Sequence, residues 1–348
     1  MISRRFKHKD FLIFNQEFAV LIKSGLPIIA ALDTIIENAE ESKLIEIIEK
    51  IRLDVFEGQS VTQAFAKHPY LFTKFYLACL KAGEKSGDIP SALLRYIEYS
   101  KKTALIRQKV ISASIYPIIL TAVSMFTLMF LLIYVVPSLT GTFTEGNTSI
   151  PVMTAVLINL SEVLKSGFFY IIAAFICICG AFSYYNKTDT GKMFTDRLKL
   201  NLPFLGNIFL NYSVSKLART MATVLQSGIH LVETVKISSD ILNNAFLNEK
   251  LDNVVKQIEQ GASLSDALLH VDLFPNMAIR MIAAGEGSGA LEPVLNEVAE
   301  FYENDVDAKL SILTSAIEPA LMVLMGLIIG FIVLAMYMPI FQLASTVG

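Results

Sequence analysis

Three long stretches almost without charged side chains limit the folds open to this chain. Residues 112–136 and 167–185 contain no charged side chain, and residues 310–338 contain one, Glu318. A helix needs roughly 20 apolar residues to cross the hydrocarbon of a bilayer. Only 18% of the chain is charged, against about 25% in soluble proteins. The sequence therefore predicts three transmembrane helices, because core helices of a soluble protein are rarely so long and so uniformly apolar.

The distribution of lysine and arginine sets the predicted direction of these spans. Basic residues precede the first and third spans and follow the second, whereas residues 137–166 contain only Lys165 and residues 339–348 contain none. Positively charged segments stay in the cytoplasm. Residues 1–111 and 186–309 are therefore predicted to be cytoplasmic, and the 137–166 loop and the short 339–348 tail to face outward. No secretory signal is expected at the N-terminus, which is therefore predicted to lie in the cytoplasm, with the chain in the inner membrane.

The chain contains one unit twice. Ser24-Gly25-Leu26 returns as Ser227-Gly228-Ile229 at an offset of 203, and later matches return at an offset of 202. Each copy consists of a soluble domain followed by an exit helix. Both copies start in the cytoplasm, so the chain needs one return crossing between them. The span at 167–185, which has no partner in the repeat, supplies it.

Both soluble copies have the pattern of helical domains. Apolar residues recur at helical spacing, and no alternating strand pattern of weight occurs. Capping boxes begin two of the expected helices, at Ser60-x-x-Gln63 and Ser263-x-x-Asp266. The predicted fold is all-α, with two homologous cytoplasmic bundles of about six helices each and three transmembrane helices.

The sequence contains no pattern of catalytic or ligand-binding residues. A glycine-rich stretch at 285–289 lacks the spacing of a dinucleotide site, and Gly83-Glu-Lys-Ser is only a fragment of a phosphate loop. The histidines and cysteines have no metal-ligand or redox spacing: His8, His68, His230, His270, Cys79, Cys177 and Cys179. We therefore expect no enzyme, catalytic residue, metal or cofactor. The net charge of −3 gives no reason to expect direct nucleic-acid binding.

The motif Ala-Gly-Glu-x-Ser-Gly occurs at the same place in both domains. One interpretation is a tight helix–helix turn in which the glutamate accepts hydrogen bonds from backbone amides, with Asp88 and Ser288 as helix caps. The other is a corner that docks a partner. The candidate docking residues are Gly83, Glu84, Ser86, Gly87, Gly285, Glu286, Ser288 and Gly289.

Glu318 is the single charge within the predicted spans. A carboxylate inside a membrane is energetically expensive and usually has a partner or a function, although Glu318 lies close enough to the cytoplasmic end to reach the interface. Pro319 follows it, and Tyr116-Pro117 occupies the equivalent place in the first span. We hypothesise that Glu318 faces a groove and accepts a cationic group.

The two cytoplasmic domains differ in charge. Residues 1–111 contain 17 basic and 13 acidic residues, a net charge of +4, whereas residues 186–311 contain 11 and 16, a net charge of −5. On the last helix before each exit span, Arg95 and Lys101 align with Glu297 and Glu303. One interpretation of this contrast is that both charged surfaces are simply solvated. The alternative is that the domains dock on each other, or on partners, through surfaces of complementary charge.

The chain resembles the F family of type II secretion and the platform proteins of type IV pili, including the competence-pilus proteins of Gram-positive bacteria. The resemblance follows the chain in order and rests on five stretches: Phe14-x-Gln16-x-Phe18-x-x-Leu21-x-x-Ser24-Gly25-Leu26-Pro27, the two Ala-Gly-Glu-x-Ser-Gly motifs, Ile317-Glu318-Pro319, and the tail from Gly330 through Phe341. Many members carry a segment before the first helical domain, whereas this chain begins almost at that domain.

The resemblance implies a non-enzymatic platform in the inner membrane, a homodimer or larger. Its implied partners are a hexameric cytoplasmic ATPase, pilins or pseudopilins, and other inner-membrane components of the machine. The platform would couple the ATPase to assembly of pilins. The alternatives are a small repeat-built transporter or channel and an unrelated membrane scaffold. The sequence leaves open whether such a machine builds a pilus, secretes proteins or takes up DNA.

Overall fold

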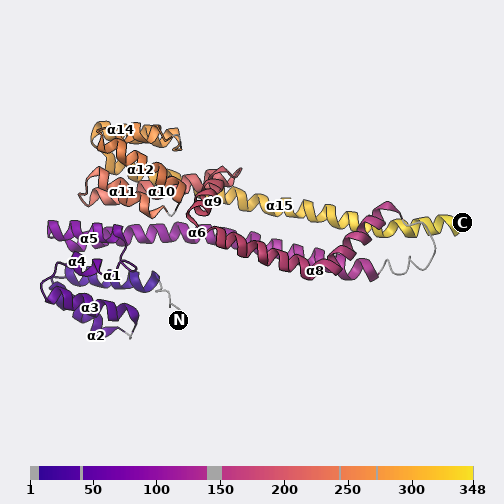
Figure 1. The fold of residues 1–348 in the computed structure, drawn as a ribbon, viewed down its shortest axis with the longest axis horizontal. Helices are drawn as coiled ribbons and strands as arrows, with labels where there is room; N and C mark the ends of the chain where they lie inside the picture. The colour runs from indigo at the N-terminus through magenta and orange to yellow at the C-terminus, as the bar shows by residue number, and fades with distance from the viewer. Residues whose placement is uncertain (1–7, 40–41, 139–150, 243, 272, 348) are drawn as a thin grey trace. The chain divides into compact units, whose positions relative to one another are not determined.

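The computed structural model describes residues 8–39, 42–138, 151–242, 244–271 and 273–347, and within these ranges every regular element is a helix (Figure 1). The chain divides into two compact units. The first combines residues 1–107 with 196–306, and the second combines residues 108–195 with 307–348. The first unit holds both soluble copies of the repeat, and the second holds the long apolar helices.

The described residues of the first soluble domain form six helices. They are α1 (His8–Lys23), α2 (Ile28–Asn38), α3 (Lys43–Phe56), α4 (Val61–Ala66), α5 (Lys74–Ser86) and the start of α6 (Ile89–Phe130). Its core is rich in aromatic rings, which pack from α1, α4, α5 and α6 around Tyr76. Most of the apolar residues that recur at helical spacing on α1 and α3 are buried, and Phe18 and Ile48 are 0% exposed.

The second soluble domain repeats this order. Its six matching helices are α10 (Leu205–Gln226), α11 (Leu231–Ile241), α12 (Ala245–Glu259), α13 (Leu264–Leu269), α14 (Asn276–Ser288) and the start of α15 (Leu291–Val347). A further helix, α9 (Asp189–Asn201), comes before them. The offset between copies is 203 up to α13 and 202 from α14 onward. The one-residue slip therefore lies in the loop before α5 and α14, where length can change without disturbing a packed helix.

One of the two expected capping boxes forms completely. The Ser60 hydroxyl accepts from the Gln63 amide, and the Gln63 side chain accepts in return from the Ser60 amide. At the second site the Ser263 hydroxyl accepts from the Asp266 amide at 3.0 Å, but the Asp266 carboxylate accepts from that hydroxyl instead of from the backbone. Aspartate is one methylene shorter than glutamine, so it does not reach the Ser263 amide.

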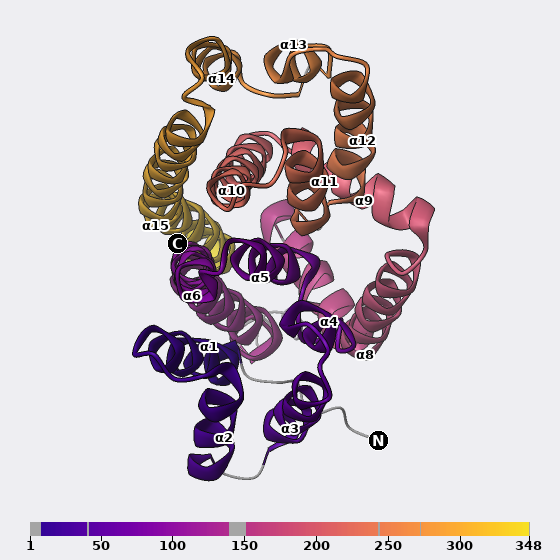
Figure 2. The same ribbon diagram turned by 90° about the vertical axis from the view of Figure 1, so that its left-hand side faces the viewer.

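The two soluble domains share an apolar contact within the first unit. Helix α5 of the first domain packs against α10 and α11 of the second (Figure 2). Val224 and Ile237 from the second domain belong to the same buried cluster as the aromatic core of the first. The interface is therefore an extension of a hydrophobic core, and the two copies form one compact body.

The second unit contains the continuation of α6, the π-helix η1 (Leu131–Val135), α8 (Val152–Tyr185), the first part of α9 and the continuation of α15. Within the described residues, α6 with η1 and α15 are long and apolar enough to cross a membrane. The same test finds a shorter apolar stretch in α8, Ile176–Tyr185. The soluble domains thus run into these apolar segments without a break, because α6 and α15 are continuous.

Helix α8 begins earlier than the span predicted at 167–185. Residues 152–166, expected within a loop, are helical, and Pro151 stands at the helix N-cap. Their inner side is buried against η1 and α15, where the Ser161 hydroxyl donates to the Leu132 carbonyl at 2.5 Å. The Thr154 hydroxyl likewise donates to the Ala335 carbonyl. The rest of the expected loop, residues 139–150, lies outside the described residues.

Candidate functional site

The repeated Ala-Gly-Glu-x-Ser-Gly motif forms the end of α5 in the first domain. Both oxygens of the Glu84 carboxylate accept from the start of α4, Oε1 from the Val61 amide at 2.7 Å and Oε2 from the Thr62 amide at 3.1 Å. A carboxylate at a helix N-terminus satisfies amides that have no partner within the helix. Glu84 therefore joins α5 to α4.

The second domain repeats this geometry. Glu286 accepts from the Leu264 amide at 2.6 Å, from the Ser265 amide at 3.1 Å and from the Ser265 hydroxyl at 2.8 Å. The glutamate thus has a structural role in both copies. Whether the same corners also dock a partner stays a prediction.

The glycines of the motif allow a close turn into the next helix. Gly87 and Gly289 end α5 and α14 with φ of 74° and 71°, a backbone region that suits glycine. At Gly83 an added Cβ would lie 2.7 Å from the Ala92 Cβ on α6, and at Gly285 it would lie 2.8 Å from the Val294 Cβ on α15. The first glycine of each motif is therefore required by helix–helix packing.

Of the two expected helix caps, Asp88 and Ser288, the structure contains only the first. Asp88 caps α6, because its Oδ1 accepts from the Ser91 amide at 3.1 Å. Ser288, expected as an equivalent cap, is instead the last residue of α14 and donates back to the Ala284 carbonyl at 2.8 Å. Ser86 does the same toward Gly83. The residue of the second copy aligned with Asp88 is Ala290, which has no side-chain acceptor.

Replacing Glu84 with alanine is expected to destabilise the first domain, because the Val61 and Thr62 amides would lose their only side-chain acceptor. Leaving buried donors unpaired costs about 1–3 kcal/mol. The full-length protein in detergent should melt several degrees lower by circular dichroism, and Glu286→Ala should produce a similar loss. Glu57→Ala, at a neighbouring exposed carboxylate, serves as the control. An unchanged melting temperature in Glu84→Ala would contradict this role.

Glu318 lies in a groove between α6 and α15 in the second unit. The groove has a volume of about 230 Å³. Its lining is apolar apart from Glu318, Ser124 and Thr127, and its remaining residues are Leu120, Val123, Leu321, Met322 and Met325. Glu318 forms no ion pair within the part of the chain that the structure describes. Within a membrane span, a carboxylate without such a pair is energetically expensive.

Tyr116, Pro117 and Pro319 do not line this groove. Tyr116 is exposed on α6, one residue before Pro117, and both prolines lie within continuous helices. A proline in a helix leaves one carbonyl without its amide partner. Of the four residues that the sequence singled out in the spans, Glu318 is the one that lines the groove.

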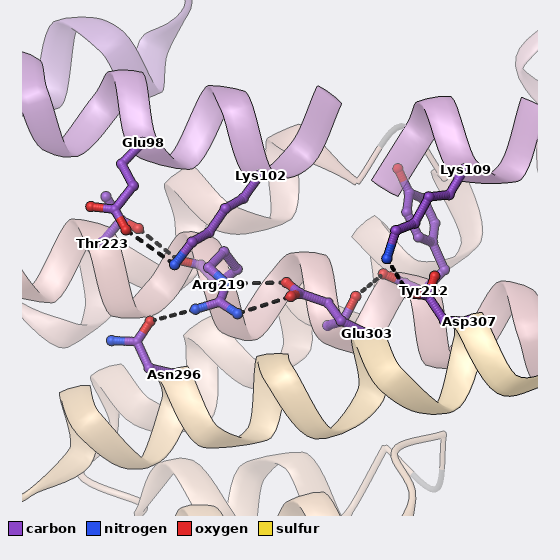
Figure 3. A network of polar contacts seen from close by, with 10 residues as sticks. Glu98, Lys102, Lys109, Tyr212, Arg219, Thr223, Asn296, Glu303 and Asp307 are labelled. Atoms are coloured by element: carbon purple, nitrogen blue, oxygen red, sulfur yellow. Dashed lines mark hydrogen bonds and ion pairs between the residues drawn. The ribbon is translucent and has the colours of Figure 1, made fainter. Parts of the chain in front are cut away.

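The four residues expected to form contacts between the domains do not meet. Glu303 is bound within its own domain, where it pairs with Arg219 in two bonds of 3.0 and 3.1 Å (Figure 3). The Arg219 guanidinium also donates to Asn296 at 2.9 Å. Arg95 is half-buried, and Lys101 and Glu297 are exposed. Docking through these charges stays a prediction.

Arg219 was not singled out by the sequence, although it is 8% exposed. Its position corresponds to Gln16 of the first copy, as Glu303 corresponds to Lys101. Between the first copy and the second, Gln16 is replaced by Arg219 and Lys101 by Glu303. These two changes together could have indicated an ion pair within the second domain.

Cys79 is buried in the core of the first soluble domain. Burial raises the pKa of the Cys79 thiol to about 12, so the thiol stays protonated near neutral pH and reacts slowly. Within the described ranges no group of three or more histidine, cysteine, aspartate or glutamate side chains is placed to hold a metal ion.

The chain matches a sequence model of the family described as "Type II secretion system (T2SS), protein F" twice, over residues 14–137 and 217–339. This chain belongs to that family. The two matches reproduce the internal repeat, and together they cover more than half of the chain. The protein F family is thus represented here by two tandem copies of its domain.

Curated relatives of this protein F chain extend over nearly its whole length. The "Type IV pilus assembly protein PilC" of Thermus thermophilus is 33% identical, and the match covers 98% of this chain and 84% of the relative. The protein of the same description from Pseudomonas aeruginosa is 31% identical, with 99% and 93% covered. The "Type II secretion system protein F" of Pseudomonas aeruginosa is 30% identical, with 99% and 85% covered. The chain is therefore an all-α membrane protein of the pilus and secretion platform family.

Proposed function

We propose that this platform protein couples a hexameric cytoplasmic ATPase to the assembly of pilins or pseudopilins, from the inner membrane and without catalytic activity of its own. The soluble domains face the cytoplasm and receive the mechanical input. The apolar helices span the membrane, and there they contact a pilin or pseudopilin as it enters the filament. The C-terminus lies outside.

The observation that carries this proposal is Glu318, a carboxylate without an ion-pair partner among the described residues. It lies in a mostly apolar groove between two helices that continue out of the soluble domains. Movement of either soluble domain is transmitted along α6 or α15 to the groove wall, because each helix is continuous from one unit to the other. The carboxylate suits a cationic group on an apolar helix. The names of the relatives in pilus assembly and secretion agree with such a cargo.

A transporter or channel has less support. Among the described helices the only polar side chains lining the groove are Ser124, Thr127 and Glu318, which offer little lining for the path of a soluble substrate.

Co-purification of the full-length, detergent-solubilised chain with the secretion-type ATPase of the same cell tests the proposal. The ATPase is expected in the eluate with the wild-type chain. Deletion of the gene is expected to abolish surface filaments, DNA uptake or protein export, scored side by side in one strain. No loss in any of the three assays, with no ATPase recovered, would contradict the proposed function.

A further inference from the structure

A group of exposed apolar side chains surrounds the connection between α9 and α10 in the first unit. One of them lies on the last turn of α9, two lie in the connection, and two lie one turn apart at the start of α10. Each is at least 38% exposed. Gathered apolar side chains of this size mark a surface that binds a protein or a membrane. We call them the α9–α10 patch: Leu198, Leu202, Phe204, Leu205 and Phe209.

Phe204 is held outward in this patch by a strained turn. Its backbone has φ of 62° and ψ of −50°, and the Leu205 amide donates to the Pro203 carbonyl at 2.7 Å. These angles and this bond define a γ-turn of the rare, strained form. Among the described residues, no other non-glycine residue has a positive φ. Backbone strain of this kind is concentrated at functional sites, and here it leaves the Phe204 ring 85% exposed.

Packing against the second domain keeps this turn from relaxing. A Cβ on Gly206 would clash with the Leu200 carbonyl oxygen, so the end of α9 and the start of α10 approach as closely as glycine allows. The buried Asp196 accepts from the Ala245 amide at 3.0 Å, which ties α9 to the start of α12 (Figure 2). The exposure of Phe204 therefore comes from a fixed local structure.

Basic side chains border the patch. The Arg197 guanidinium carbon lies 5.7 Å from the centroid of the Phe246 ring, and the Lys250 Nζ lies 5.9 Å from the same centroid. Lys199 pairs with Asp196, but its side chain stays half exposed. Two more lysines precede these residues in the sequence, Lys187 and Lys192. Exposed phenylalanine and leucine beside basic residues are typical of segments that lie on the surface of an anionic membrane.

The course of the chain keeps the patch near the bilayer. The apolar stretch Ile176–Tyr185 ends α8, and three residues separate it from α9. This junction is compact, because the Thr195 hydroxyl donates to the Asn186 side-chain oxygen at 2.5 Å and the Gly191 amide donates to the Thr188 hydroxyl at 3.1 Å. Helix α9 has 13 residues, which span about 20 Å. The patch therefore stays within that distance of the end of the predicted return span.

We propose that the α9–α10 patch lies in the headgroup region of the bilayer, with Phe204 reaching the acyl chains and the basic border facing anionic lipid. The lipid surface is its occupant, because the patch follows directly on the apolar end of α8 and carries the opposite charge to that surface. This contact attaches the second soluble domain to the membrane at a point of its own. It does not depend on coupling to an ATPase or on the cargo.

Fluorescence of the full-length chain reconstituted into vesicles tests this placement. Cys177→Ala and Cys179→Ala remove the exposed cysteines, and Cys79 stays because it is buried. Phe204→Cys then carries a polarity-sensitive fluorophore in vesicles of phosphatidylcholine and phosphatidylglycerol. We expect blue-shifted emission, and quenching by lipids that carry a spin label near the top of their acyl chains. Leu269→Cys, an exposed apolar position on α13, is the control and should give the emission of a probe in water.

Substitutions in the patch and its border provide the second measurement. With the fluorophore at Leu198→Cys, Phe204→Asp should remove most of the quenching, because a carboxylate opposes entry into the bilayer. Leu269→Asp should leave the quenching unchanged. Arg197→Gln combined with Lys250→Gln should lower the quenching in vesicles with phosphatidylglycerol and not in phosphatidylcholine alone. A wild-type circular dichroism spectrum in each variant separates the loss of lipid contact from unfolding.

A probe in the patch also distinguishes lipid from a protein occupant. Emission like that in water at residue 204, in vesicles that contain no other protein, would overturn the proposal. In the intact cell, a photo-crosslinking amino acid at residue 204 should leave the chain at its own mass. A covalent adduct with a second protein, another copy of this chain included, would equally overturn it, because protein would then cover the patch.

Discussion

Glu318→Gln is expected to abolish filament assembly or export while the chain stays folded and inserted in the membrane. The substitution keeps the shape of the side chain and removes its charge. If a cationic group of the cargo binds Glu318 in the groove, the loss of one member of a desolvated charge pair costs about 2–5 kcal/mol. A change of about 1.4 kcal/mol is already tenfold in binding, so assembly should fall well beyond tenfold.

The measurement is complementation of a gene deletion with Glu318→Gln, scored by filament number and by the amount of chain in the membrane. Glu297→Gln, at an exposed carboxylate of the soluble part, is the matched control and should restore assembly. Glu318→Asp keeps the charge and should retain part of the activity. Wild-type filament numbers in Glu318→Gln would show that the charge has no role.

Arg219→Ala is expected to produce the largest loss of stability. It leaves the Glu303 carboxylate, which is only 18% exposed, without its guanidinium partner, and it leaves Asn296 without a donor. Removing one partner of a buried ion pair costs about 3–5 kcal/mol. Thermal unfolding of the full-length protein, followed by circular dichroism in detergent, should show the second domain melting at least several degrees earlier.

Lys109→Ala is the matched control, because Lys109 pairs with Asp307 on the same helix as Glu303 but is itself 60% exposed (Figure 3). An exposed pair contributes less than about 1 kcal/mol. Equal effects of the two substitutions would mean that the Arg219 pair is not buried in solution.

Periodicity and repetition predicted much of this fold. The helical spacing of apolar residues located helices such as α1 and α3, and the offset of 203 with a slip to 202 matched the order of helices in both domains. The capping sequence at Ser60 predicted the start of α4, since the two bonds involved are local. The helix positions and the capping box depend on residues close together in the sequence, and therefore the sequence pattern alone predicts them.

The differences come from contacts between segments distant in sequence. The start of α8 at Val152 depends on burial against η1 and α15, and charge counting along the chain contains no sign of that packing. The Arg219–Glu303 pair joins residues on α10 and α15. For the motif glutamates, the sequence predicted that the side chains accept hydrogen bonds from backbone amides. It did not show that these amides belong to the starts of α4 and α13, because that depends on the tertiary structure.

Topology is the central claim of this account: one unit occurs twice, inserted both times with its soluble domain in the cytoplasm. Reporter fusions in the intact cell test this topology most directly. Alkaline phosphatase is active only outside the cytoplasm, and a fluorescent protein fluoresces in the cytoplasm. A fusion after residue 150 should give phosphatase activity alone, and a fusion after residue 250 should give fluorescence alone. Fluorescence at residue 150 or phosphatase activity at residue 250 would contradict the account.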